Sequence, residues 1–235
     1  MWILALDSTA IAASVAICRD DKAVAAFHLN NGNTHSETLL PMIDAALAVA
    51  GLSIDDIDML ACSNGPGSFT GVRIGAATVK GLAFGKGKTV LGISTLEALA
   101  ENACPAPEGT LIVPVMNARR GQLYNAIFRV ENGALTRVTE DRAIAAVDLA
   151  GELSSLALPF YLVGDGVAEM RRLAPDCTPM PFTPLATDQN AVSVAKCAFR
   201  RYLAGERGTD AALSPVYLRL PQAERERLER LQRKE

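Results

Sequence analysis

Asp7 is the acidic residue with the clearest opportunity for chemistry, because it directly follows a short apolar run, residues 2–6. In an ATP-dependent small-molecule phosphotransferase, such an aspartate organises magnesium beside a first phosphate-binding loop. These loops place glycine beside the acid so that the backbone can approach phosphate, whereas Asp7 is followed by Ser8-Thr9-Ala10-Ile11. Gly164-Asp165-Gly166 would be the second loop, but such turns before a helix are common and need no ligand. A phosphotransferase therefore stands as the alternative function.

The histidines and cysteines form no metal-ligand pattern. His28 and His35 are seven residues apart, one expected on a strand and the other near a helix start, so they cannot form the i, i+4 pair of a zinc-binding helix. The cysteines are odd in number and lack a Cys-x-x-Cys pair, which argues against disulfides and a zinc ribbon. We expect no metal site and interpret the five as reduced, mostly core residues: Cys18, Cys62, Cys104, Cys177 and Cys197.

Composition excludes several classes of protein. The 235 residues are 49% hydrophobic and 21% charged, which is the balance of a globular chain with one large domain or two of roughly 100 residues. The net charge of −3 creates no overall attraction to phosphate backbones or anionic lipid, so RNA contact would have to be local or come through a partner. No basic leader precedes Asp7 and no run of eighteen apolar residues occurs. We therefore expect a cytoplasmic protein with no membrane association.

The string Gly-Pro-Gly-Ser-Phe-Thr-Gly-Val-Arg-Ile-Gly, residues 65–75, lies between a predicted strand and a predicted helix. Its first three glycines, Gly65, Gly67 and Gly71, predict a tight structural turn, and Ser68 or Thr70 can cap the helix. A helix N-terminus also attracts anions, but the Gly-Lys-Ser/Thr of a P-loop is absent. Gly67→Val should damage folding, because a β-branched side chain is costly where a turn needs positive φ.

The order of predicted elements repeats along the chain. Three strands form a meander and are followed by helix, strand, helix and strand, at residues 2–6, 12–18, 23–29, 36–50, 57–63, 70–84 and 89–93. Cys104-Pro105-Ala106-Pro107 indicates a hinge or linker. Strands then recur at 110–116, 122–130, 134–138 and 160–163, with helices near 146–154, after Gly166 and at 189–203.

This order resembles the ribonuclease-H-like lobe that is duplicated in the actin, Hsp70 and sugar-kinase (ASKHA) superfamily. The predicted fold is therefore α/β, with two such lobes whose mixed sheets are flanked by helices. The expected parts are an N-terminal lobe at 1–104 with partner-binding helices, a C-terminal lobe at 105–220 and a charged C-terminal helix or tail at 221–235. Glu–Arg pairs at i, i+4 support helix in the last part.

Five strings together resemble the TsaB family, also called YeaZ, over almost the whole chain. They are ILALDST at 3–9, THSETLLP at 34–41, GPGSFTGVRIG at 65–75, NARRGQLY at 117–124 and SPVYLR at 214–219. Relatives usually carry Asp where this sequence has Asn117, and a required carboxylate would not be lost so simply. We interpret residues 117–121 as a structural turn with a paired-arginine surface rather than a substrate contact.

The resemblance implies a pseudoenzyme of the glycoprotease-like family, with no catalytic residue and no cofactor of its own. Such a protein pairs with TsaD, and the ATPase TsaE joins them. The assembly transfers threonylcarbamoyl from an adenylate to the adenosine beside the tRNA anticodon, so contact with tRNA is expected to be indirect. The alternative is a phosphotransferase of the sugar-kinase type. The sequence leaves open whether ATP or ADP binds at an interface with partners.

Two predicted helices carry more apolar surface than one small lobe can bury. Their core stripes are Leu39, Leu40, Ile43, Ala46, Leu47 and Ala50 in the first, and Val72, Ala76, Val79 and Ala83 in the second. The C-terminal segment or the other lobe would cover the second faces, or these faces bind another subunit. We predict a homodimer of the isolated chain and, by exchange, a heterodimer with TsaD. The predicted partner-binding residues are Met42, Ala45, Val49, Ile74, Ala77 and Phe84, with Gly81 on the same face.

Overall fold

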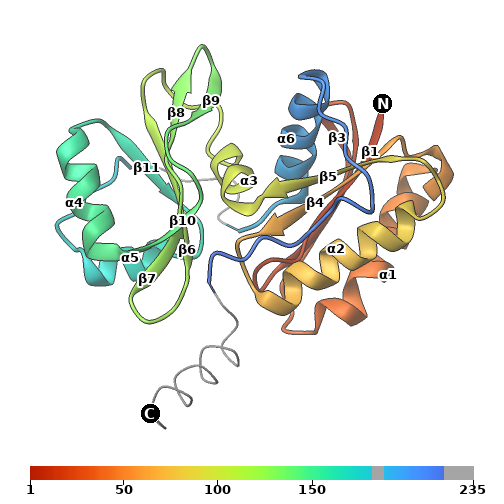
Figure 1. Cartoon of the computed structure of the whole chain (residues 1–235), viewed down its shortest axis with the longest axis horizontal. Helices are drawn as coiled ribbons and strands as arrows, with labels where there is room; N and C mark the ends of the chain where they lie inside the picture. Colours follow the sequence, from red (N-terminus) through yellow and green to blue (C-terminus); the bar gives the residue numbers. More distant parts are fainter. Residues whose placement is uncertain (182–187, 220–235) are drawn as a thin grey trace, which may run out of the picture.

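Each half of the chain builds its own β-sheet, and Figure 1 shows the two sheets side by side as two lobes. The structure is a computed structural model that describes residues 1–181 and 188–219. The predicted C-terminal helix or tail at 221–235 lies outside the described residues. The predicted fold class, α/β with two lobes of mixed sheet flanked by helices, is confirmed.

The first sheet has the strand order β3-β2-β1-β4-β5. Its meander is antiparallel, and β4 and β5 run parallel to β1. The strands are β1 Trp2–Asp7, β2 Ala13–Arg19, β3 Lys22–Leu29, β4 Met59–Gly65 and β5 Thr89–Ser94. Strands β1 and β4 are buried on both faces, which explains their continuous apolar runs. Because Leu6 pairs with Cys62, the carboxyl ends of β1 and β4 lie at the same edge.

Helices cover both faces of this sheet. Leu4 and Leu6 of β1 face α1 (His35–Ala50) and α2 (Phe69–Ala83), and the alternate residues Ile3 and Ala5 face α6 (Ala191–Leu203). Helix α1 ends at Gly51, whose φ of +67° is the left-handed cap that favours glycine. The 3₁₀ turn Ile54–Asp56 then leads into β4.

Helix α6 was expected in the second lobe, within residues 105–220, but it packs on the first sheet. The segment that follows also returns to the first lobe: the Val90 amide donates to the Gly208 carbonyl, and the Val216 amide donates to the Asn64 carbonyl. The chain therefore leaves the first lobe after β5 and re-enters it from residue 189 onward. Element order could not reveal this return, because it does not state which sheet a late helix covers.

The second sheet is organised around β6, which pairs with β11 in parallel and with β7 and β8 in antiparallel orientation. Strands β10 and β9 extend it at the outer edges. Helices α4 and α5 pack on one face, and α3 packs on the other, between the two sheets. The elements are α3 Thr95–Glu101, β6 Leu111–Asn117, β7 Gln122–Asn125, β8 Phe128–Glu131, β9 Ala134–Arg137, β10 Arg142–Ala145, α4 Ala146–Leu156, β11 Phe160–Val163 and α5 Val167–Leu173.

The single strand predicted at 122–130 is broken into β7 and β8. Both pieces keep one register along β6, since Val115 pairs with Asn125 and Ile112 with Phe128. Opposite the break lies Pro114, which has no amide hydrogen to donate to the ladder. The Asn125 side chain donates instead to the Pro114 carbonyl, at 3.1 Å.

Helix α3 and strand β10 were not predicted. The sequence did contain a signal for α3, because Ser94-Thr95-Leu96-Glu97 is a capping-box pattern. Ser94 Oγ accepts a hydrogen bond from the Glu97 amide, at 3.2 Å. Strand β10 has only four residues and depends on its pairing with β7.

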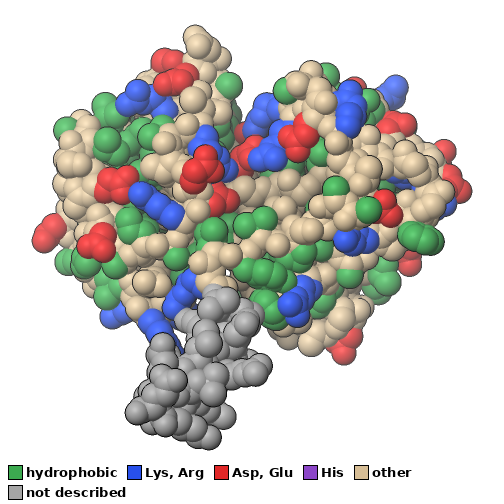
Figure 2. Space-filling view, viewed as in Figure 1, with side chains coloured by type: hydrophobic (Ala, Val, Ile, Leu, Met, Phe, Trp, Pro, Cys, Tyr) green, Lys and Arg blue, Asp and Glu red, His purple; other side chains and the backbone are tan. Residues whose placement is uncertain are grey.

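The surface carries a mixture of charges. In the view of Figure 2, Lys and Arg side chains alternate with Asp and Glu over both lobes. No helix within residues 1–181 and 188–219 combines the length and the apolar character needed to cross a membrane.

Candidate functional site

The five strings that carry the family resemblance meet at the carboxyl edge of the first sheet, where the lobes adjoin. The Ser68 amide donates to the Thr9 carbonyl at 2.7 Å, and the His35 ring contacts the Ala10 carbonyl at 2.7 Å. Residues 214–219, here called the strap, continue from the first lobe to the second. Arg219 of the strap donates to the Ala118 carbonyl in the loop after β6.

Asp7 is fully buried at the centre of this region, with 0% of its surface exposed. Its Oδ1 accepts hydrogen bonds from the Thr9 amide at 2.8 Å and from Thr9 Oγ1 at 2.7 Å, and its Oδ2 accepts one from Ser63. Burial raises the pKa of Asp7, and the hydrogen bonds from Ser63 and Thr9 oppose that rise. Both carboxyl oxygens are therefore engaged by the protein's own donors.

The glycine-rich turn packs directly against the loop after β1. A Cβ atom on Gly71 would lie 1.9 Å from the Ser8 carbonyl oxygen, and one on Gly67 would lie 2.5 Å from that of Thr9. Gly65 has a φ of +121°, and its Cβ would lie 2.3 Å from the Val216 carbonyl oxygen. The expected reason for glycine at 67 was wrong, because Gly67 is outside the positive-φ region and is restricted by the close approach of Thr9.

Ser68 caps α2, since its Oγ accepts a hydrogen bond from the Gly71 amide at 3.3 Å. Ser8 Oγ donates to the Gly71 carbonyl at 2.9 Å, so the loop after β1 and the first turn of α2 hold each other. The sequence left Ser68 and Thr70 as alternatives for the cap, and the structure selects Ser68.

The Gly164-Asp165-Gly166 turn packs on the end of β6 in a similar way. A Cβ on Gly164 would lie 2.4 Å from the Val115 carbonyl oxygen, and the Gly166 amide donates to that same oxygen at 3.0 Å. Asp165 accepts a hydrogen bond from the Asn117 amide at 3.3 Å. This turn is thus occupied by contacts with β6.

Asn117 shapes the loop that carries the paired arginines. Its Oδ1 accepts a hydrogen bond from the Arg119 amide at 2.8 Å, which is an Asx turn that an aspartate oxygen can form equally well. Arg119 and Arg120 both have left-handed backbone, with φ of +62° and +56°. The exchange of Asp for Asn at this position therefore preserves the turn.

The candidate metal ligands do not come together. His28 lies 3.6 Å from Asp188 and His35 contacts the Ala10 carbonyl. Within the described ranges, no group of three or more His, Cys, Asp and Glu side chains is placed to hold a metal ion. Burial raises the pKa of the Cys62 thiol to about 12 and that of Cys18 to about 11, so both stay protonated and unreactive.

The predicted partner-binding residues lie on α1 and α2 with different exposures. Val49 is 73% exposed and Phe84 is 79% exposed, while Ala77 is exposed and Ala45 and Ile74 are partly exposed. Met42 was placed wrongly: it is only 8% exposed and belongs to the core of the first lobe. Leu40, expected in the core, is instead 50% exposed. Both residues flank the core stripe at similar angles, so the helical wheel alone could not separate them.

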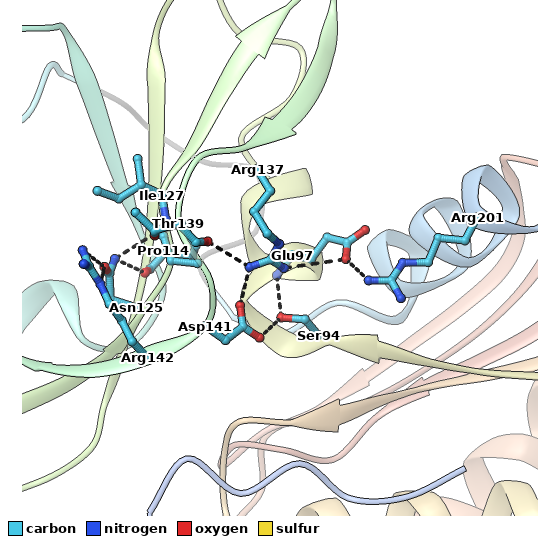
Figure 3. Close-up of polar contacts among 11 residues, drawn as sticks. Ser94, Glu97, Pro114, Asn125, Ile127, Arg137, Thr139, Asp141, Arg142 and Arg201 are labelled. Atoms are coloured by element: carbon cyan, nitrogen blue, oxygen red, sulfur yellow. Dashed lines mark hydrogen bonds and ion pairs between the residues drawn. The ribbon is translucent and has the colours of Figure 1, made fainter. Parts of the chain in front are cut away.

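A polar network that sequence reasoning missed fastens the two lobes together (Figure 3). Glu97 on α3 accepts a hydrogen bond from Arg201 on α6 and forms an ion pair with Arg137 on β9 at 3.9 Å. Arg137 also donates to Asp141 at 2.6 Å, and Ser94 donates to the same carboxylate. These residues are scattered over the sequence, so no local pattern could have joined them.

A second missed cluster lies where the strap crosses α2. The Arg73 guanidinium stacks 3.8 Å from the Phe69 ring centroid, and its Nε donates to the Tyr217 hydroxyl at 2.8 Å. The Phe69 and Tyr217 ring centroids are 4.8 Å apart. Phe69, Arg73 and Tyr217 all lie within strings that carry the family resemblance, but the sequence alone does not show that these strings are in contact.

These features define a class of protein: two α/β lobes whose glycine-rich turns at the lobe boundary pack closely against the chain's own backbone. The family model described as TsaD: tRNA N6-adenosine threonylcarbamoyltransferase matches residues 30–204. The tRNA threonylcarbamoyladenosine biosynthesis protein TsaB of Escherichia coli K12 is 35% identical over 167 residues, 71% of this chain and 72% of that protein. The chain therefore belongs to the TsaB (YeaZ) family.

Further relatives agree in sequence and structure. TsaB of Bacillus subtilis 168 is 30% identical over 176 residues, covering 75% of this chain and 76% of that protein. A solved structure titled YeaZ from Pseudomonas aeruginosa has a TM-score of 0.77 at 28% identity, covering 92% of this chain and 99% of that one. Another from that organism, an uncharacterized protein with similarity to peptidase YeaZ, has a TM-score of 0.81 at 27% identity, over 93% and 99%. Family membership places the chain in the biosynthesis of tRNA threonylcarbamoyladenosine.

Proposed function

We propose that this chain is a non-catalytic subunit required for threonylcarbamoyl transfer to the adenosine beside the tRNA anticodon. It acts by pairing with TsaD through α1 and α2 and by helping to recruit TsaE. The observation that carries the proposal is the exposed apolar surface of these two neighbouring helices, formed by Val49 of α1 and by Ala77 and Phe84 at α2.

Burial of these side chains would stabilise an interface. Complete burial of a valine, leucine or phenylalanine side chain contributes about 1.5–3 kcal/mol relative to exposure, and Val49 and Phe84 are both more than 70% exposed in the single chain. The small side chains of Ala45 and Ala77 permit close approach of a partner helix. A second copy would use the same surface, so we infer that the homodimer and the TsaD heterodimer exclude each other.

The surroundings of Asp7 support a role without chemistry. A magnesium ion in a phosphotransferase is bound by one or two carboxylates and by substrate phosphates. Asp7 would have to break three hydrogen bonds and leave a fully buried position before it could serve as such a ligand. No observation favours the sugar-kinase alternative over the partner role.

Ala45→Arg tests the partner surface. An unpaired charge at the centre of an interface costs several kcal/mol, so association with TsaD and with a second copy should be lost. Ala45 is partly exposed in the single chain, so the variant should still fold. Ala134→Arg, the same change at an exposed residue of β9, is the matched control. Sedimentation measures association with a second copy, a TsaD pull-down measures the heterodimer, and a thermal melt measures folding.

If Ala45→Arg retains both assemblies, or if it fails to fold, the assignment of this face is wrong. Loss of association in both arginine variants would indicate a general effect of added charge rather than a specific interface.

A further inference from the structure

We propose that a basic and aromatic surface along the strap contacts the sugar-phosphate backbone of RNA directly. We call this surface the basic seam and define it by Arg73, Arg119, Tyr217 and Arg219. The inference rests on the proposed function and deepens it, because the sequence led to the expectation that tRNA is reached only through partners. The basic seam makes this chain part of the RNA-binding surface.

The strap brings the seam residues of both lobes onto one line. Tyr217 accepts a hydrogen bond from Arg73 of α2, at 2.8 Å, and Arg219 donates to the carbonyls of Ala118 and Arg119, the latter at 3.4 Å. Tyr217 and Arg219 are two residues apart, a span of at most about 7 Å of extended chain. The three arginines therefore follow one short path across the boundary between the lobes. Figure 2 shows Lys and Arg side chains on both lobes at the lower end of that boundary.

The charge of the seam is not neutralised by any carboxylate of the described residues. Over residues 1–181 and 188–219, no carboxylate lies within ion-pair distance of Arg73, Arg119 or Arg219. Six other arginines of the described residues do pair with carboxylates: Arg129, Arg137, Arg142, Arg172, Arg200 and Arg201. Neighbouring cations without counter-charges create a local positive potential on a chain whose net charge is −3. Such a surface attracts a polyanion.

The guanidinium of Arg73 is held in place by aromatic neighbours and can bind a phosphate. Its plane stacks on Phe69 at 3.8 Å and lies 5.7 Å from the Tyr217 ring. Nε is used by the Tyr217 hydroxyl, which leaves the terminal N–H groups to bind a phosphate in the bidentate manner typical of arginine. Tyr217 is 40% exposed, so part of its ring is open to a stacked base.

RNA fits this surface better than an acidic protein does. Arginines combined with an exposed aromatic ring bind unpaired nucleotides through phosphate contacts and stacking, whereas an acidic peptide would use the charge alone. The members of this family act in the biosynthesis of a tRNA nucleoside, so a tRNA is the nucleic acid that such a surface would meet. An acidic protein surface is the competing occupant, and the experiment separates the two.

The test measures binding of a fluorescently labelled, unmodified tRNA transcript to the full chain, alone and mixed with TsaD, over a series of salt concentrations. Arg73→Glu and Arg119→Glu should each weaken binding about tenfold at low salt and reduce the salt dependence by about one phosphate contact. Lys22→Glu is the matched control, because Lys22 is exposed and lies opposite Arg19 in the β2–β3 ladder, at the other end of the sheet from the seam. Its RNA affinity should equal that of the unmodified chain.

Two further variants separate RNA binding from folding. Arg73→Lys keeps the charge but loses the bidentate fork, so its affinity should lie between those of the unmodified chain and Arg73→Glu. A folded Arg73→Lys that binds RNA as weakly as Arg73→Glu would assign Arg73 to packing on Phe69. Arg119 is held through its backbone amide and carbonyl, so Arg119→Glu should fold normally and report on binding even if Arg73→Glu does not fold.

Several outcomes would overturn the inference. One is that folded Arg73→Glu and Arg119→Glu variants bind tRNA as tightly as the unmodified chain. Another is that the unmodified chain binds no tRNA, with or without TsaD. Variants that lose TsaD or TsaE while keeping RNA affinity would assign the surface to a protein. Failure of the proposed function is a separate result: an unmodified chain that neither pairs with TsaD nor promotes threonylcarbamoyl transfer.

Discussion

Replacing Gly71 by Ala should destabilise the first lobe, although alanine is the better helix former. Gly71 lies in the first turn of α2, where the helix meets the loop after β1. The added Cβ would lie 1.9 Å from the Ser8 carbonyl oxygen, and real Cβ contacts are essentially never shorter than 3.0 Å. The loop or the helix must therefore move by about 1 Å, and the Ser8–Gly71 hydrogen bond of 2.9 Å is strained or broken.

Three contributions set the expected size of the effect. Overpacking of this kind costs about 1–3 kcal/mol, and the lost hydrogen bond costs about 1 kcal/mol. The higher helix propensity of alanine stabilises the helix by at most about 1 kcal/mol and so offsets part of this loss. The net loss is about 1–3 kcal/mol, which for a chain of this length lowers the melting temperature by about 2–12 °C.

Thermal melts of Gly71→Ala and Gly81→Ala provide the assay. Gly81 lies in the interior of α2, and a Cβ there meets nothing within 4 Å. The control should therefore raise the melting temperature by about 2–4 °C, from about 1 kcal/mol of helix propensity. If Gly71→Ala melts at or above the unmodified chain, the close contact with Ser8 does not constrain this turn and the reasoning is wrong.

Three other substitutions probe the same region and the junction of the lobes. Gly67→Val should lower the melting temperature because its Cβ would lie 2.5 Å from the Thr9 carbonyl oxygen; an unchanged melt with lost TsaD binding would show a direct contact instead. Burial raises the pKa of Asp7 above its ordinary 3.8, so the folded state holds this proton to higher pH than the unfolded state. The free energy of unfolding of the unmodified chain, compared with that of Asp7→Asn, should then fall as the pH rises from about 3.8 through the raised pKa. Urea titrations that give the same difference between the two proteins across this pH range would refute the prediction. Glu97→Gln should lower the free energy of unfolding, measured in urea, by about 1–3 kcal/mol, because Arg201 and Arg137 lose a partly buried carboxylate. Glu169→Gln, which removes a pair with a single, exposed arginine within α5, should lower the free energy of unfolding by clearly less than Glu97→Gln does.

Local patterns in the sequence predicted most of the first lobe. Its helices begin and end within one residue of their expected positions, because amphipathic periodicity and the Gly51 cap act locally. The capping role of Ser68 also followed from the residue type alone. The partner of Asp7 could not be predicted in this way, since Ser63 is 56 residues away and reaches it only because β4 lies beside β1.

The failures have a common physical origin in long-range packing. The wheel of α1 could not show that the helix turns Met42 toward the core and Leu40 toward solvent, because the sheet beneath decides that rotation. The return of α6 to the first sheet and the meeting of Arg73 with Tyr217 depend on how the chain re-enters the first lobe. Such contacts become visible only in three dimensions.

The central claim is that this chain acts through a partner and not through chemistry of its own. Threonylcarbamoyl transfer to tRNA, reconstituted with TsaD and TsaE, tests it most directly. The account predicts that transfer requires this chain, that Ala45→Arg abolishes it, and that Asp7→Asn supports the full rate at a temperature where the variant is folded. Transfer that is lost in folded Asp7→Asn and retained in Ala45→Arg would contradict the account.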